Sequence, residues 1–146
     1  MSEKIKKRKI MLVGTGFVGM SFAYSMLSEK GIDELVLVDV NEDKAKGEQM
    51  DLNDGLVYAD TKMKISAGSY ADTNIVVLTA GAAQKPGQTR LDLVKINANI
   101  TKGVCKALKE NNFNGILVVA NNPVDIMTYV AWKESGLPKN HVIGSG

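Results

Sequence analysis

The chain has 146 residues, and 45% of them are hydrophobic, so it can form one ordinary domain with a substantial core. Its 18 basic and 16 acidic residues leave a formal charge of +2, which gives no broad electrostatic reason to expect nucleic acid as a partner. One cysteine permits no internal disulfide, and no apolar run approaches the roughly 20 residues of a membrane span. We therefore expect a single cytoplasmic domain over residues 1–146 that does not enter a membrane.

The first half of the sequence predicts a strand-helix-strand unit followed by a second helix and two more strands. Runs of Val, Leu and Ile predict strands at residues 9–13 and 35–38. Between them a helix is expected whose large apolar residues recur at intervals of three and four on one face, with Gly31 as a stop signal: Phe17, Met20, Tyr24 and Leu27. A helix at 42–52 and strands at 63–67 and 75–79 follow.

The second half continues the same alternation. A loop rich in Gly, Ala, Gln and Pro at residues 81–89 precedes a long helix expected at 90–111. A strand at 115–119, a helix with Pro123 in its first turn running to Ser135, and a strand beginning at 142–143 complete the pattern. Alternating strands and helices are typical of a parallel sheet covered on both faces. The expected fold is therefore α/β, a six-stranded doubly wound sheet.

The segment Gly14-Thr15-Gly16-Phe17-Val18-Gly19 fits the glycine fingerprint of the Rossmann dinucleotide-binding fold. It lies between a predicted strand and a predicted helix, where the helix N-terminus can face a pyrophosphate. Gly14 permits the tight turn, Gly16 lets the backbone approach the phosphates, and Gly19 lets helix and strand pack closely.

Asp39 lies 20 residues after Gly19, at the end of the second predicted strand, where a carboxylate accepts hydrogen bonds from the adenosine ribose. Its charge would repel the 2'-phosphate of NADP, and the nearest base is Lys44, so the pattern favours NAD. The alternative, glycines that only form a turn and an aspartate that only caps a helix, leaves the joint spacing unexplained.

Residues 79–91 closely resemble the active-site loop of the lactate and malate dehydrogenase family, and the resemblance continues through residues 121–125 and 142–146. It implies hydride transfer between NAD(H) and a small 2-keto or 2-hydroxy acid. The position matching Arg90 polarises the substrate carbonyl in that family, and Asn122 matches an asparagine that hydrogen-bonds the substrate. Gln84 matches the position that reads the substrate side chain, and a neutral glutamine there implies pyruvate and lactate.

Further positions beside the cofactor are also implied by the resemblance. The cofactor set is Gly14, Gly16, Phe17, Val18, Gly19, Asp39, Tyr70, Gly81, Ala82, Ala120, Asn121 and Asn122. No spacing typical of a metal site occurs. Asp54 stands where relatives often have histidine, in a segment expected to face a partner subunit, so a homo-oligomer is an open expectation.

The residues that complete catalysis in this family, a proton-transferring histidine, its aspartate partner and an arginine for the substrate carboxylate, are expected beyond residue 146. His141 is the single histidine here and does not match the catalytic position, so we expect an exposed loop residue. The chain is thus expected to be an NAD-binding half that is inactive or nearly so alone. A free-standing dinucleotide-binding or assembly module and, less favoured because of Gln84, the malate branch remain alternatives.

Overall fold

The structure is a computed structural model that describes residues 7–68, 70 and 72–146. Along the described chain strands alternate with helices, except that the strands at Lys64–Ala67 and Ile75–Leu78 follow each other directly, and one short 3-10 helix at Lys139–His141 precedes the last strand. The strands are β1 (Lys9–Val13), β2 (Glu34–Val38), β3 (Lys64–Ala67), β4 (Ile75–Leu78), β5 (Ile116–Val119) and β6 (Val142–Gly144). The helices are α1 (Phe17–Met26), α2 (Glu42–Leu56), α3 (Arg90–Glu110) and α4 (Val124–Ser135).

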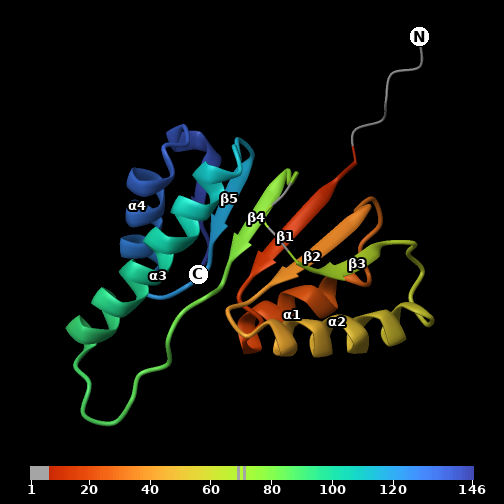
Figure 1. The fold of residues 1–146 in the computed structure, drawn as a ribbon, viewed down its shortest axis with the longest axis horizontal. Helices are drawn as coiled ribbons and strands as arrows, with labels where there is room; N and C mark the ends of the chain where they lie inside the picture. The colour runs from red at the N-terminus through yellow and green to blue at the C-terminus, as the bar shows by residue number, and fades with distance from the viewer. Residues whose placement is uncertain (1–6, 69, 71) are drawn as a thin grey trace.

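All six strands are parallel and form one sheet in the order β3-β2-β1-β4-β5-β6. The chain runs outward from β1 to β3, returns to the centre with β4 and continues to the other edge. Helices α1 and α2 lie on one face of the sheet, and α3 and α4 lie on the other (Figure 1). The predicted doubly wound α/β fold is therefore confirmed.

The two faces of the sheet bury two separate hydrophobic clusters, because successive side chains of a strand point to opposite faces. In β1, Met11 and Val13 pack in the cluster that includes Val104 of α3 and Met127 of α4. Leu12, which lies between them, packs in the cluster beneath α1 and α2. Each β1 residue in these clusters is at most 4% exposed, so the strand is apolar on both faces.

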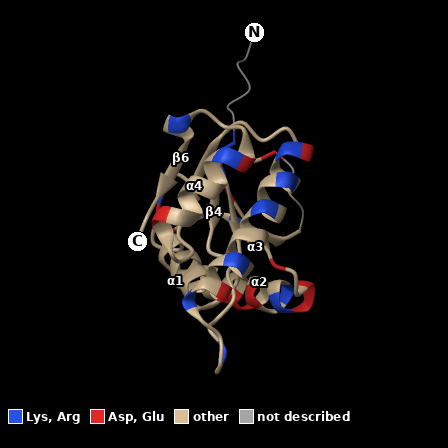
Figure 2. Ribbon diagram, turned by 90° about the vertical axis from the view of Figure 1, so that its left-hand side faces the viewer, with Lys and Arg blue, Asp and Glu red and all other residues tan. Residues whose placement is uncertain are grey.

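Charged side chains lie mainly on the helices and loops. Figure 2 shows charged residues of both signs on α2, which is capped at its start by Asn41, whose side chain accepts a hydrogen bond from the Lys44 N–H. Such a helix presents its apolar residues inward and its charges outward. Among the described residues, no helix is long and apolar enough to cross a membrane.

Helix α1 differs from its prediction. Phe17 is 98% exposed and Tyr24 is 46% exposed, whereas Gly19, Met20 and Ala23 form the buried face. Met20 and Leu27 pack in the cluster beneath α1 as predicted, whereas the small residues Gly19 and Ala23, which let the helix approach the sheet closely, were not predicted. The helix also ends at Met26, before the expected stop at Gly31.

The remaining boundaries differ by a few residues. Helix α2 continues to Leu56, four residues past its expected end at 52, and α4 begins at Val124 with Pro123 as the residue before it. The peptide bond between Asn122 and Pro123 is cis. Cys105 is fully buried, with its Sγ 3.7 Å from the carbonyl oxygen of Ala131, so it packs between α3 and α4.

Candidate functional site

The turn between β1 and α1 requires glycine at its first and last fingerprint positions. Gly14 has φ +102°, and a Cβ there would lie 2.5 Å from the Ala80 backbone nitrogen. A Cβ on Gly19 would collide with the Gly14 carbonyl oxygen and lie 2.7 Å from Thr79 Oγ1. The Thr79 hydroxyl donates to that same carbonyl at 2.8 Å, so the turn is tied to the end of β4.

Gly16 has a different environment. A Cβ added to it would have no protein atom within 4 Å, so the space beside it is open to a ligand. Gly16 precedes α1, which has no side-chain cap and no acidic residue in its first turn. The first N–H groups of the helix are thus available to an anion at the positive end of the helix dipole. This arrangement fits the pyrophosphate of a dinucleotide.

Asp39 lies directly after β2 and faces the same turn. Its Oδ2 accepts hydrogen bonds from the Thr15 N–H at 2.8 Å and the Thr15 hydroxyl at 2.6 Å, and its Oδ1 accepts from the Asn41 N–H at 3.0 Å. Although partial burial acts in the opposite direction, these hydrogen bonds lower the pKa of Asp39, with Lys44 contributing attraction. The carboxylate is therefore fixed, ionised at neutral pH, and retains acceptor capacity for ribose hydroxyls.

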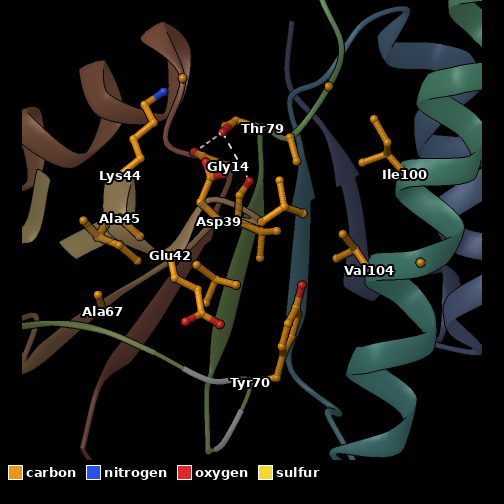
Figure 3. A pocket seen from close by; sticks show the side chains of 18 of the residues that line it. Gly14, Asp39, Glu42, Lys44, Ala45, Ala67, Tyr70, Thr79, Ile100 and Val104 are labelled. Atoms are coloured by element: carbon orange, nitrogen blue, oxygen red, sulfur yellow. Dashed lines mark hydrogen bonds between the residues drawn. The ribbon is translucent and has the colours of Figure 1, made fainter. Parts of the chain in front are cut away.

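These groups line a cavity of about 1080 Å³ at the carboxyl ends of β1, β2 and β4. Figure 3 shows Asp39 and Thr79 beside Gly14, with Lys44 and Ala45 on one side and Ile100 and Val104 of α3 on the other. The cavity lies where the sheet reverses its strand order, between β1 and β4. Dinucleotides bind at this switch point in doubly wound sheets.

The predicted cofactor residues divide into two groups. Five of them line the cavity: Gly14, Gly16, Asp39, Tyr70 and Gly81. The others do not line it: Phe17 and Val18 are exposed at the start of α1, and Gly19 is on the buried face of the same helix. Past the ends of β4 and β5 lie Ala82, Ala120, Asn121 and Asn122. Burial raises the pKa of the Tyr70 hydroxyl, which therefore stays protonated at neutral pH.

The cavity also contains residues that the sequence reasoning missed. Val40, Glu42 and Lys44 line it from the region after β2, and Ile100 and Val104 line it from α3. Apolar residues on the inner face of the long predicted helix were a usable signal for the latter two, because that face had to meet the sheet. Glu42 and Lys44 gave no such signal, since charged residues at a helix start are ordinarily solvated.

The two predicted substrate residues of the long loop are exposed. Gln84 donates from Nε2 to the carbonyl oxygen of Gln88 at 2.9 Å, and the Gln88 side chain accepts from the Lys85 N–H at 2.9 Å. Arg90 is the first residue of α3, and a capping box between Thr89 and Asp92 fixes that helix start. Neither residue lines the cavity, and the loop extends away from the sheet before α3 begins (Figure 1).

Asn121 and Asn122, which follow β5, join a set of amide contacts with α3. Asn121 donates from Nδ2 to the Ala80 carbonyl oxygen at 3.0 Å and to Thr101 Oγ1 at 3.1 Å. Its Oδ1 is buried without a partner among the described residues. Asn97 of α3 donates to the Asn122 carbonyl oxygen at 2.9 Å and accepts from the Ala82 N–H at 2.8 Å.

His141 is not the exposed loop residue that the sequence predicted. It ends the 3-10 helix, is half-buried, and its Nδ1 lies 3.1 Å from the carbonyl oxygen of Gly115. Gly115 precedes β5, so this contact lies at the amino ends of the strands, opposite the cavity. The ring is held by a backbone acceptor that the sequence pattern did not reveal, and it is remote from Asn122. Among the residues described, no cluster of His, Cys, Asp or Glu could hold a metal ion.

The fold and the site together define a dinucleotide-binding domain of the Rossmann type, with a glycine turn, a fixed carboxylate after β2 and a cavity at the switch point. Residues 8–144 match the family model described as the NAD binding domain of lactate/malate dehydrogenase. The chain belongs to this family, and NAD is the family's cofactor.

Known relatives agree with this assignment. The chain is 55% identical over 144 residues to an L-lactate dehydrogenase of Halalkalibacterium halodurans, covering 97% of this chain and 46% of that protein. It is 51% identical over 146 residues to an L-lactate dehydrogenase of Lactococcus lactis subsp. cremoris, covering 98% and 46%. A solved structure of the minor L-lactate dehydrogenase of Enterococcus mundtii in its ligands-bound form superposes with a TM-score of 0.91 at 53% identity, covering 94% of this chain and 45% of that one. The chain thus spans about half the length of the relatives it matches.

Proposed function

We propose that these 146 residues act as the NAD-binding domain of an L-lactate dehydrogenase, which transfers a hydride between NADH and pyruvate. The observation that carries the proposal is the joint placement of the glycine turn and Asp39 at one cavity on the switch point. The relatives at 51 to 55% identity, which are L-lactate dehydrogenases, support the choice of reaction.

The cofactor part of the proposal assigns a role to each cavity group. The nicotinamide ring, when bound, supplies or accepts the hydride. Backbone N–H groups after Gly16 bind the pyrophosphate, and Asp39 accepts hydrogen bonds from the adenosine ribose hydroxyls. Phe17 and Val18 form the start of the helix next to the pyrophosphate, and Tyr70 and Gly81 form part of the cavity wall. The segments at Ala82 and at Ala120 to Asn122 flank the nicotinamide ring.

The substrate part assigns roles to three residues around that side. Arg90 stabilises negative charge that develops on the carbonyl oxygen of the substrate, since a guanidinium offers several N–H donors and stays charged. Asn122 donates a hydrogen bond to the substrate. Gln84 faces the substrate methyl group, where a neutral amide leaves no unpaired charge and offers no partner for a second carboxylate. In this proposal the exposed loop that carries Gln84 and the start of α3 that carries Arg90 close over the substrate.

None of the residues assigned to this site above is a histidine that could act as the proton donor. The single histidine, His141, lies at the amino ends of the strands and bonds Gly115. We therefore expect the 146-residue chain by itself to bind NADH and to show little or no pyruvate reduction, because removing an acid-base group lowers a rate by about 10² to 10⁴. A cytoplasmic location and assembly into a homo-oligomer are part of the same proposal. Exposed apolar residues on and just after α2, Met50, Val57 and Tyr58, support the assembly.

Fluorescence titration of the purified chain with NADH and NADPH tests the cofactor assignment. NADH should bind more tightly, and equal affinities for the two would contradict the role of Asp39. The substrate assignment is tested by following NADH oxidation with pyruvate and oxaloacetate in the full-length protein that carries this domain. Wild type should prefer pyruvate, and Gln84→Arg should shift the preference toward oxaloacetate. An unchanged preference in the variant would remove Gln84 from its proposed role.

A further inference from the structure

Asn97 is a buried amide in the middle of α3 that uses both ends of its side chain. It is 3% exposed, its Oδ1 accepts the Ala82 N–H at 2.8 Å, and its Nδ2 donates to the Asn122 carbonyl oxygen at 2.9 Å. One side chain thus connects the segment after β4 with the segment after β5. A buried amide with its donor and acceptor both satisfied has a single low-energy orientation, because reversing it would place like groups together.

The connection lies where the sheet no longer holds these two segments. The ladder between β4 and β5 ends with the pair Leu78 and Val119, followed by one bond from the Ala120 N–H to the Leu78 carbonyl oxygen. Beyond that bond the segments are joined by amide side chains. Asn121 donates to Ala80, and Asn97 bonds Ala82 in one segment and Asn122 in the other. The separation of the two segments therefore depends on these amides.

Gly81 lies directly against the same side chain. A Cβ on Gly81 would be 3.4 Å from Asn97 Oδ1, and Gly81 itself lines the cavity. The position of the Asn97 amide thus sets the wall of the cavity at this point. Removing the amide would leave the Ala82 N–H and the Asn122 carbonyl oxygen without a partner and the segment at Gly81 without its support.

We propose that Asn97 is a positioning residue that fixes the segment Gly81–Ala82 and Asn122 at the separation required by the nicotinamide half of the cofactor. The proposal rests on the proposed function, because Asp39 and the glycine turn assign the adenosine and phosphate portions to β2 and β1. The other half of the dinucleotide then extends past β4 toward β5, across the two segments that Asn97 joins. Asn97 acts through those segments and is not itself assigned a contact with the substrate.

A comparison of NADH with AMP separates positioning from general stability, because AMP occupies only the adenosine end. Both ligands are titrated against wild type, Asn97→Leu and Asn97→Asp. The leucine variant has similar volume and no hydrogen-bonding group, and we expect it to bind NADH roughly tenfold more weakly while AMP affinity changes less than about twofold. The aspartate variant keeps the acceptor for Ala82 and loses the donor to Asn122, so we expect a loss confined to NADH here as well.

Asn53→Leu is the matched control. Asn53 is a half-buried asparagine of α2 whose Nδ2 also donates to backbone carbonyl oxygens, those of Gln49 at 2.9 Å and Ile65 at 3.4 Å, but it does not line the cavity. Its replacement should leave the ratio of NADH to AMP affinity unchanged. Equal loss of both ligands in the Asn97 variants, or unchanged NADH affinity in Asn97→Asp, would overturn the positioning role. Failure of wild type to bind NADH would instead overturn the proposed function on which that role rests.

Discussion

Gly16 and Gly19 of the fingerprint differ in what surrounds them, so alanine should weaken cofactor binding at one position and lower stability at the other. In Gly16→Ala the new methyl group meets no protein atom, so the fold should stay intact while NADH affinity falls by an order of magnitude or so, because the methyl occupies the pyrophosphate approach. In Gly19→Ala the methyl meets the Gly14 carbonyl, so we expect a loss of about 1 to 3 kcal/mol in unfolding free energy. Urea unfolding and NADH titration of both variants give the comparison, and a stable Gly19→Ala would contradict the close packing described here.

A second residue-scale prediction concerns Asp39 and Val40, which lie next to each other at the cavity. Asp39→Ser removes the carboxylate, and Val40→Arg adds a cation at an exposed position that lines the cavity. The double variant should raise the ratio of NADPH to NADH affinity by roughly tenfold, because it removes a carboxylate that repels the 2'-phosphate and adds a guanidinium that can pair with it. Asp39→Ser alone is the control and should lose NADH affinity without a comparable gain in NADPH affinity. Unchanged selectivity in the double variant would mean that Asp39 does not face the ribose.

At this scale the sequence predicted residues whose spacing is tied to chemistry and missed residues whose role comes from packing. Gly14, Gly16 and Asp39 follow a fixed spacing along the chain, and all three line the cavity. Asn97 and Thr101 are polar residues at positions that repeat on the buried face of a helix, which was a readable signal because a buried amide needs partners. The partners themselves, on two distant loops, depend on the tertiary arrangement.

Among the elements, the start of α3 combines a helix cap with Arg90, the residue proposed to bind the substrate carbonyl oxygen. Thr89 caps the helix through its hydroxyl, which accepts the Asp92 N–H at 3.1 Å, and Arg90 follows immediately. Thr89→Ala should lower the free energy of unfolding by about 1 kcal/mol and loosen the first turn that carries Arg90. Urea unfolding measures the stability change. Ser21→Ala, which removes an exposed hydroxyl bonded within α1, should change it by less than about 0.5 kcal/mol, and equal effects of the two would argue against the cap.

The number, type and order of the elements follow from local patterns, whereas the buried face of α1 and the C-terminal end of α2 do not. Buried parallel strands are continuous apolar runs, and all six were predicted within about one residue. The face of α1 was predicted only in part: Met20 and Leu27 pack in the cluster as expected, but Phe17 and Tyr24 are exposed and the small residues Gly19 and Ala23 are buried. Helix α2 continues to Leu56 because Leu52 and Leu56 still pack in the cluster beneath it, a contact that depends on how far the neighbouring strands extend.

For the whole molecule, the cavity lies at the carboxyl ends of the central strands, between helices that cover opposite faces of the sheet. Its wall includes Lys44 and Ala45 of α2 from one face and Ile100 and Val104 of α3 from the other. A ligand in this cavity contacts helices of both faces and stabilises the folded chain by mass action. At one hundred times its Kd, NADH should add about 2.7 kcal/mol and raise Tm by several degrees.

The matching control for the thermal shift is the Gly16→Ala variant at the same NADH concentration, where the rise in Tm should be smaller in proportion to its weaker binding. The measurement is differential scanning fluorimetry with a dye suited to NADH. An equal rise in wild type and variant would place the bound cofactor away from Gly16, and no rise in either would contradict binding at the cavity.

The burial of Cys105 makes its reactivity a measure of how often α3 and α4 separate. The Sγ atom lies between α3 and α4, and burial, with a further contribution from Glu134, raises the pKa of this thiol to about 11. Since the thiolate is the reactive form, a thiol-specific reagent at neutral pH should modify the folded chain far more slowly than the unfolded chain. Because the sequence contains one cysteine, the rate of modification reports how often these two helices separate. NADH, by holding the α3 side of the cavity, should slow that labelling, and a labelling rate independent of NADH would show that the helices separate without releasing the cofactor.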